Sequence, residues 1–388
     1  MSISPPERNG GVALVVSGGP APGINSVISA CTIEARKRGL EVFGLRNGFK
    51  GVTLGEAEAV VPLTIEQVST IARSGGSILG TSRFSPFTEA THEERFVREL
   101  TARGIDKVIV IGGEGSAWLS HQLALRTPLA VVHVPKTIDN DLILPNHYPS
   151  FGFETARAVG TTILETLMVD ARTCRRWFLV TTMGRRAGFL ALGLGLASGA
   201  TMTLIPEEFQ RQSQTPADIA RLIAGSIRAR AAAGRPWGIA LLAEGLFDSI
   251  DLSSSPDFHD LPRDHLGRIQ YSHLELGDII APEIHRLCGA ELELPIITKN
   301  IGYELRCHAP VSFDLEYTKF LGFGAVKLLA EGQSDIMVTR DFDTIGAHPL
   351  AGMLDANGQM HSRTVDLNSD LYRVARGFMI RPEPTVGG

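Results

Sequence analysis

The chain is poor in cysteine and aromatic residues, and it carries no excess of basic charge. Only 4 of its 388 residues are cysteines, none forms a C-x-x-C pair, and no His/Cys spacing indicates zinc. The formal net charge of −5 argues against a nucleic-acid-binding protein. Residues 1–11 lack the apolar core of a signal peptide, and the most apolar stretch, 189–205, is short for a membrane span. We therefore expect a cytoplasmic protein with reduced thiols that binds neither nucleic acid nor membrane.

Hydrophobic residues, at 44%, and glycine, at 41 residues, are abundant instead. A chain of this length predicts roughly two domains, each with its own core. One unit recurs along it: an apolar strand, a polar glycine-rich loop and an amphipathic helix. The segments expected as strands are 12–16, 107–111, 129–134, 178–181 and 237–242. This alternation predicts an α/β fold with mostly parallel sheets and helices on both faces, in which ligands bind at the carboxyl ends of strands. The longest expected loop is 251–264.

The run Pro135–Asp141 is the most informative motif, because it follows an expected strand directly. It delivers a lysine, a hydroxyl and two carboxylates together, as Lys136, Thr137, Asp139 and Asp141. One carboxylate can take a proton from a sugar hydroxyl while the other groups handle phosphate and metal charge. The alternative is an acidic, solvated loop, which explains Asp-Asn-Asp alone but not the whole run among the motifs that accompany it.

Three further loops are typical of phosphate sites. Ser17–Gly23 lies between an expected strand and a helix, where backbone N–H groups favour phosphate; it is not G-x-G-x-x-G, so a dinucleotide site fits poorly. Arg83 ends a glycine-rich loop and can neutralise a transferring phosphoryl group. Glu114, within 112–116, can reach magnesium. Each has an ordinary alternative: a strand–helix turn, a surface arginine, and a charge at a helix N-terminus.

A second group of residues suits a sugar phosphate. Arg176 and the run Met183-Gly184-Arg185 bring guanidinium groups to a strand end, and arginine captures phosphate monoesters in a bidentate way. Glu244 can accept hydrogen bonds from sugar hydroxyls, and Tyr303 and Arg306 are candidates for further phosphate contacts. Singly, each of these signals is weak.

Together these loops resemble the 6-phosphofructokinase family, from about Gly11 to about Leu329. The matching motifs are P-K-T-I-D-N-D at 135–141, S-G-G-x-x-P-G-x-N at 17–25, G-G-x-x-L-G-T-S-R at 75–83, G-G-E-G-S at 112–116 and M-G-R at 183–185. The resemblance implies two doubly wound lobes with the active site in the cleft between them. The donor-binding lobe is expected to comprise 1–148 and about 305–350, and the fructose-6-phosphate-binding lobe 149–304 and the C-terminal segment.

The resemblance also implies magnesium-dependent phosphoryl transfer to the 1-hydroxyl of fructose 6-phosphate. Asp139 matches the base, with Lys136 and Arg83 beside it in catalysis, and Glu114 matches the magnesium carboxylate. The expected substrate contacts are Thr137, Asp141, Arg176, Met183, Gly184, Arg185, Glu244, Tyr303 and Arg306, and the expected donor contacts are Gly19, Arg83, Gly115 and Ser116. Arg176 is expected to reach in from a neighbouring subunit, which implies a homodimer or homotetramer.

Some positions depart from the family pattern. Glu114 stands where many members have Asp, and Tyr303 where bacterial ATP enzymes usually have His. Ser29 and Ile33 stand where allosteric members place effector-binding arginines. We therefore expect weak or absent regulation by ADP and phosphoenolpyruvate.

Two positions bear on the phosphoryl donor. Gly115 has no side chain, so a nucleotide α-phosphate can pass where pyrophosphate-dependent relatives tend to carry Asp. Lys136 is typical of the pyrophosphate enzymes, although some ATP-dependent members combine it with Gly. On the steric argument we expect ATP, with pyrophosphate as the alternative. A non-catalytic regulatory subunit that binds sugar phosphate is the alternative of another class, and Asp139 and Asp141 argue against it. A lipid or NAD kinase would not explain 135–141.

Overall fold

The computed structural model describes residues 10–209, 214–251, 275–288 and 294–382. Nearly all of the loop expected at 251–264 lies outside the described residues. The chain divides into two compact units, here called unit 1 (Met1–Ala156 with Leu305–Arg363) and unit 2 (Arg157–Glu304 with Thr364–Gly388). Each unit is therefore built from segments that are distant in sequence.

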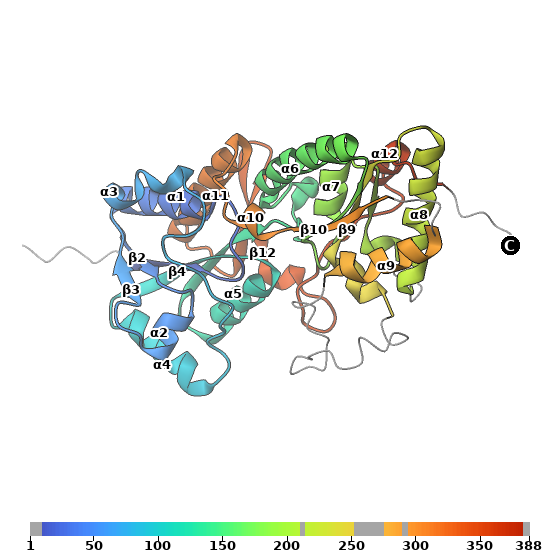
Figure 1. Ribbon diagram of the computed structural model, residues 1–388. Coiled ribbons are helices and arrows are strands. Elements are labelled where there is room, and N and C mark those ends of the chain that lie inside the picture. Colours follow the sequence, from blue (N-terminus) through green and yellow to red (C-terminus); the bar gives the residue numbers. More distant parts are fainter. Residues whose placement is uncertain (1–9, 210–213, 252–274, 289–293, 383–388) are drawn as a thin grey trace, which may run out of the picture. The chain divides into compact units, whose positions relative to one another are not determined.

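Unit 1 contains one mixed sheet (Figure 1). Its strands are β1 (Gly11–Val16), β2 (Glu41–Leu45), β3 (Val60–Pro62), β4 (Ile105–Gly112), β5 (Ala130–Thr137), β6 (Phe151–Gly152), β11 (Ile336–Asp341) and β12 (Thr344–Pro349). They follow the order β12-β11-β5-β4-β1-β2-β3, with β6 paired to β5. The central pairings are parallel, and only the edge strands β12 and β3 pair antiparallel.

Helices cover both faces of this sheet, because successive side chains of each strand point to opposite sides. The helices of unit 1 are α1 (Ile24–Lys37), α2 (Lys50–Leu54), α3 (Ile65–Val68), η1 (Ile71–Arg73), α4 (Ala90–Thr101), α5 (Glu114–Arg126), η2 (Pro145–His147), α11 (Ser312–Ala330) and η8 (Leu350–Met353). Leu14 of β1 packs in the cluster formed with α1 and α11, whereas Val15 packs in the cluster formed with α4 and α5. Figure 1 shows these helices on opposite faces. The short helix α10 (Tyr303–Arg306) spans the boundary between the units.

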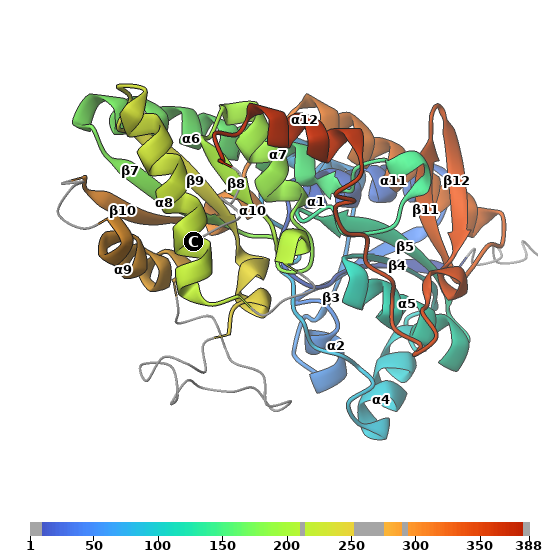
Figure 2. The same ribbon diagram turned by 90° about the vertical axis from the view of Figure 1, so that its right-hand side faces the viewer.

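Unit 2 contains a smaller, entirely parallel sheet in the order β10-β7-β9-β8. Its strands are β7 (Trp177–Thr182), β8 (Met202–Leu204), β9 (Gly238–Ala243) and β10 (Ile296–Ile301). Its helices are α7 (Phe189–Ser198), η3 (Pro206–Phe209), α8 (Pro216–Ala232), η4 (Glu244–Ser249), α9 (Leu276–Cys288) and α12 (Asp370–Phe378), together with most of α6 (Phe153–Cys174). Trp177 and Leu179 pack with α8 and α9, while α7 and α12 lie on the other face (Figure 2).

The predicted α/β class with mostly parallel sheets is confirmed. The strand expected at 129–134 continues through Thr137, so the first three residues of the 135–141 motif belong to β5 rather than to the loop after it. The apolar stretch 189–205 forms α7, a left-handed turn at Gly199 and β8. Among the helices that the structure describes, none is long and apolar enough to cross a membrane.

Candidate active site

The end of β5 turns sharply at Asn140, between the two carboxylates of the motif. Asn140 has φ of 58°, a left-handed conformation that asparagine adopts more readily than most residues. Its side-chain oxygen accepts a hydrogen bond from Ser150 N at 3.1 Å, and the Asp139 amide donates to Thr137 Oγ1 at 3.0 Å. The turn thereby sets the directions of both Asp139 and Asp141.

The glycine-rich loops expected to bind the donor converge in unit 1. Gly18 N donates to Ser82 O at 2.9 Å, and Thr81 Oγ1 donates to Gly18 O at 2.7 Å, so the 17–23 and 75–83 loops are joined. Lys136 Nζ donates to the carbonyl of Gly19. The Arg306 guanidinium packs closely on Gly19, so a side chain at this position would have to displace it. The structure thus brings Gly19 together with Lys136 and Arg306, although Arg306 was expected among the substrate contacts.

Lys136 is the electrostatic centre of this cluster. It is 3% exposed, and burial, followed by the charges of Arg306 and Arg83, lowers its pKa to about 7. Asp139 and Asp141 act in the opposite direction and raise this pKa. Such a buried lysine, among two arginines and two carboxylates, indicates a site for an anionic ligand. The negative charge of a bound polyanion would raise the pKa of the amine again and favour its charged form.

The 112–116 motif forms the N-terminus of α5, which begins at Glu114. A Cβ added at Gly115 would meet no heavy atom within 4 Å, so the space beside this glycine is open. Amide groups of the first helical turn favour a phosphate. Glu114 Oε2 accepts a hydrogen bond from Ser362 Oγ at 3.0 Å. Ser362 is a residue that the sequence analysis did not single out.

Neutral His133 supports the same motif from within β5. Burial lowers the pKa of His133 to about 3, and its Nε2 lies 2.9 Å from the carbonyl of Gly112. Since a carbonyl only accepts, Nε2 carries the proton, and Nδ1 accepts from Ser120 Oγ at 2.9 Å. The contact gives His133 a structural role, because it fixes where the 112–116 loop begins.

The acidic side chains of the candidate site have the chemistry of magnesium ligands. Glu114, Asp139 and Asp141 offer carboxylate oxygens, the hard ligands that Mg²⁺ takes. In the part of the chain that the structure describes, no group of three or more acidic, histidine or cysteine side chains forms a complete metal cage. Magnesium is commonly held through one or two carboxylates together with substrate phosphates.

The expected sugar-phosphate residues of unit 2 gather at the carboxyl ends of β7, β9 and β10. Gly184 has φ of 124°, and its carbonyl accepts from Gly245 N at 3.2 Å, which ties Met183–Arg185 to the residue after Glu244. Met183 N donates to Ile301 O at 3.4 Å, next to Gly302 and the 78% exposed Tyr303. Arg185 Nε lies 3.8 Å from Asp248 Oδ2.

Arg176 is the exception, because the structure does not bring it to this group. It precedes β7, at the amino end of a six-residue strand, whereas Met183 follows the carboxyl end. At about 3.3 Å per residue the two ends are roughly 20 Å apart. Arg176 Nε instead lies 3.4 Å from Asp170 Oδ1 of α6.

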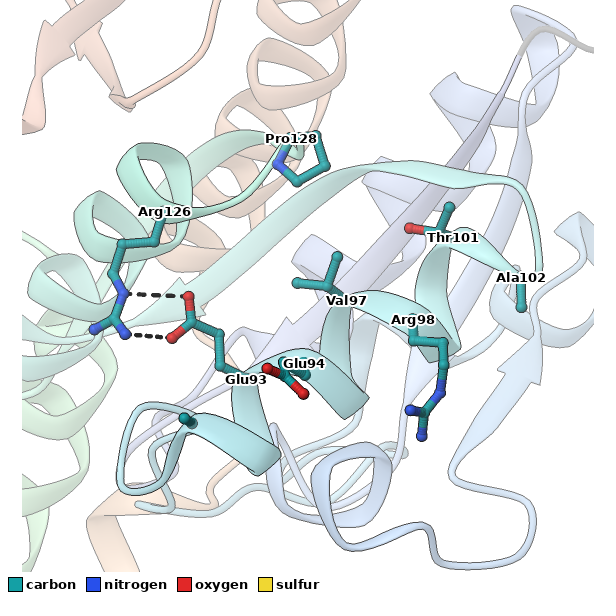
Figure 3. A pocket seen from close by; sticks show the side chains of 9 residues that line it. Glu93, Glu94, Val97, Arg98, Thr101, Ala102, Arg126 and Pro128 are labelled. Atoms are coloured by element: carbon teal, nitrogen blue, oxygen red, sulfur yellow. Dashed lines mark hydrogen bonds and ion pairs between the residues drawn. The ribbon is translucent and has the colours of Figure 1, made fainter.

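A hollow of about 780 Å³ lies elsewhere on unit 1, along α4 and the end of α5 (Figure 3). It is lined by Glu93, Glu94, Val97, Arg98 and Arg126, among others, and by none of the expected site residues. Arg126 spans its edge, with Nε 3.2 Å from Glu93 Oε1. Because none of the expected site residues lines it, the hollow is not the candidate site.

The comparisons with known proteins agree with the geometry. The family model described as phosphofructokinase matches residues 11–329. A pyrophosphate–fructose 6-phosphate 1-phosphotransferase of Thermotoga maritima is 42% identical over 96% of this chain and 91% of the relative. An ATP-dependent 6-phosphofructokinase of Lactobacillus acidophilus is 31% identical over 93% of this chain and 99% of the relative.

A solved structure gives the same fold. The pyrophosphate-dependent phosphofructokinase of Marinobacter aquaeolei superposes with a TM-score of 0.71 at 19% identity, covering 96% of this chain and 92% of that one. The chain therefore belongs to the phosphofructokinase family, and it is a glycolytic phosphotransferase that uses ATP or diphosphate as its phosphoryl donor.

Proposed function

We propose that the chain transfers a phosphoryl group from pyrophosphate to the 1-hydroxyl of fructose 6-phosphate, reversibly and with Mg²⁺. The observation that carries this proposal is the buried Lys136, which meets the Gly19 carbonyl beside Arg83 and Arg306. A compact donor without a base or ribose depends on a dense group of cations for its binding. Two relatives named as pyrophosphate enzymes are 42% and 38% identical to this chain, whereas the ATP-dependent relatives are 29–31% identical. These findings favour pyrophosphate over the ATP donor expected on steric grounds.

In the proposed reaction Asp139 removes the proton of the 1-hydroxyl as the oxygen attacks the phosphoryl group. Thr137 and Asp141 hold the sugar and the donor phosphates in line. Lys136 and Arg83 stabilise the negative charge on the transferring group and on the leaving phosphate. Bound magnesium, held through Glu114 and Asp141, would neutralise phosphate charge and orient the donor.

The sugar phosphate is proposed to bind through unit 2. Arg185 and the backbone at Met183 and Gly184 would hold it, with Glu244 accepting sugar hydroxyls and Tyr303 contributing from the end of β10. Arg306 would add positive charge for a phosphate group beside Gly19 and Lys136. Arg176 would serve the site of a neighbouring subunit, so we propose a homodimer or homotetramer. A cytoplasmic location stays a prediction.

ATP is the second candidate donor, and one observation favours it. The open space beside Gly115 leaves room for a nucleotide α-phosphate at the N-terminus of α5. Space alone permits ATP without selecting it, since pyrophosphate also fits an open site.

The test is an assay of fructose 1,6-bisphosphate formation with magnesium and fructose 6-phosphate, supplying pyrophosphate or ATP separately. We expect turnover with pyrophosphate and little with ATP. Lys136→Met should reduce the pyrophosphate reaction by about 100-fold or more, the loss typical of a preorganised cation or hydrogen-bond donor. Turnover with ATP alone would restore the steric argument at Gly115.

The same assay separates the regulatory alternative. Activity with neither donor, together with binding of fructose 6-phosphate, would identify a non-catalytic sugar-phosphate-binding subunit. Running the reverse reaction with fructose 1,6-bisphosphate and phosphate adds a check, because transfer to and from pyrophosphate is close to energetic balance, whereas the ATP reaction is nearly one-way.

A further inference from the structure

The segment 350–363 lies beyond the part of the chain matched by the family model, which ends at 329. It nevertheless belongs to unit 1 and packs on α5 and on the residues after the 135–141 motif. Met353 and Met360 share a buried cluster with Leu142 and Ala117. Figure 2 shows this segment passing beside α5. The segment is therefore fixed next to both acidic motifs.

Arg363, the last residue of unit 1, holds the turn of the 135–141 motif from two sides. Its Nε donates to the carbonyl of Asn140 at 2.6 Å, and its Nη2 donates to the side-chain oxygen of Asn140. Its own amide donates to Asp141 O at 2.8 Å. An antiparallel bridge between Leu142 and Ser362 continues the contact. The planar guanidinium thus binds both oxygens of a single residue.

That residue is the one whose backbone conformation is left-handed. Even for asparagine a positive φ carries some strain, which contacts with the surroundings offset. Asn140 lies between Asp139 and Asp141, so a relaxation of its φ and ψ would redirect both carboxylates. Burial lowers the pKa of Arg363 and the Asp141 carboxylate raises it, so Arg363 lies within electrostatic reach of Asp141.

The preceding residue reaches the other acidic motif. Ser362 Oγ donates to Glu114 Oε2 at 3.0 Å. Two adjacent residues therefore contact both acidic motifs. Arg363 contacts the 135–141 motif, which carries the candidate base, and Ser362 contacts Glu114, which is expected to hold magnesium.

We propose that Ser362 and Arg363 are positioning residues for phosphoryl transfer. Arg363 fixes the left-handed turn that aims Asp139 and Asp141, and Ser362 orients the Glu114 carboxylate toward the metal. The inference rests on the proposed function, because it takes Asp139 and Glu114 as the groups that do the chemistry.

The first test is Arg363→Met, measured with the donor that supports turnover. We expect kcat to fall about 100-fold, the typical result of misplacing a catalytic group by about 1 Å, with the KM values for both substrates nearly unchanged. Arg363→Lys should retain an intermediate kcat, because an ammonium keeps the charge but lacks the planar fork that holds both Asn140 oxygens in a fixed geometry. Guanidinium ion at a non-denaturing concentration should restore part of the kcat of Arg363→Ala, and urea should not.

Arg373→Met is the matched control, since Arg373 is an exposed arginine on α12 paired only loosely with Asp370, at 3.3 Å. It should keep the wild-type kcat and give no response to guanidinium. The positioning role is overturned if Arg363→Met has the wild-type kcat. It is also overturned if kcat falls only as much as the folded fraction of the protein falls and guanidinium ion does not restore the kcat of Arg363→Ala. Asp139→Asn is measured in parallel. Full activity of this variant would refute Asp139 as the base, so a failure of the proposed function can be distinguished from a failure of the positioning role of Arg363.

Ser362→Ala tests the second half. We expect the magnesium concentration for half-maximal activity, and the magnesium dissociation constant measured by calorimetry with the donor bound, each to rise about 10-fold, because partners of metal-ligating carboxylates typically affect metal affinity to this degree. kcat at saturating magnesium should remain near wild type. An unchanged magnesium requirement would exclude a role for Ser362 in orienting Glu114.

Discussion

Single buried residues decide how the charges of this site are arranged, and Lys136 is the clearest case. Its amine is buried against the Gly19 carbonyl, with Arg83 and Arg306 adding positive charge nearby. Active sites commonly contain residues that lower the stability of the fold because those residues are required to bind a ligand or to catalyse the reaction. In the free enzyme Lys136 should therefore lower stability while it supports catalysis.

Lys136→Met should raise the free energy of unfolding of the ligand-free protein at pH 7. The folded pKa, about 7, lies below the usual 10.5, so between these values the unfolded chain holds a proton that the folded chain has lost. Wild-type stability should consequently rise with pH from about 7 to 10.5, and the advantage of the variant should shrink over the same window. The gain below pH 7 should be on the order of a few kcal/mol.

Chemical unfolding of both proteins at pH 7 and pH 9.5 measures this effect. Lys327→Met provides the control, since Lys327 is 39% exposed and pairs with Glu331 on the surface of α11. A Lys136→Met protein less stable than wild type at pH 7 would show that the amine stabilises the fold instead.

At the scale of elements, the sequence predicted those features that are written locally. The apolar run Val12–Val16, the loop Ser17–Gly23 and the helix expected after it lie within a few residues of one another, so β1, its loop and α1 could be predicted. The same holds for β4 with the 112–116 loop. The order of the strands in each sheet and the edge strands β3 and β12 depend on contacts distant in sequence, and no local pattern specifies them.

The N-terminus of α6 shows such a distant contact. Asp314 of α11 is 0% exposed and accepts hydrogen bonds from Gly152 N at 2.9 Å, Thr155 N at 2.7 Å and Thr155 Oγ1 at 2.6 Å. These amides begin α6, where a helix favours negative charge. The carboxylate of one helix therefore caps another that lies 159 residues earlier in the chain.

Asp314→Asn should destabilise the protein by about 3 kcal/mol, because an amide N–H₂ cannot accept and leaves buried donors unsatisfied. Hydrogen exchange should accelerate at the Gly152 and Thr155 amides first. Asp343→Asn, at the exposed β11–β12 turn, is the control and should leave both quantities unchanged. Protection at Thr155 equal to wild type would exclude Asp314 as the cap.

For the whole molecule, the candidate site depends on chain segments that sequence spacing does not connect. Unit 1 joins 1–156 with 305–363, which brings Arg306 to Gly19 and Arg363 to Asn140. Arg306 could be predicted through the family resemblance, because it lies within the matched region. Arg363 could not, since it follows that region and lies 223 positions from its partner.

Arg176 leads to a prediction about assembly. It lies at the amino end of β7, roughly 20 Å along the strand from Met183, so it does not join the sugar-phosphate group of its own unit. If it serves a neighbouring subunit, Arg176→Met and Asp139→Asn should each be nearly inactive alone. Hybrids formed by co-expression should recover activity, because one site of each pair then combines an intact Asp139 with an intact Arg176 from the partner.

Two differently tagged chains allow the hybrids to be purified and assayed against each parent variant. The control pairs Asp139→Asn with Arg83→Met, whose positions both lie in unit 1 of one chain and both act on Lys136 electrostatically. That pair should recover nothing, since every site then lacks one of two groups supplied by the same subunit. Inactive hybrids of Arg176→Met with Asp139→Asn would mean that Arg176 acts within its own subunit, and the reason for expecting an oligomer with shared sites would be lost.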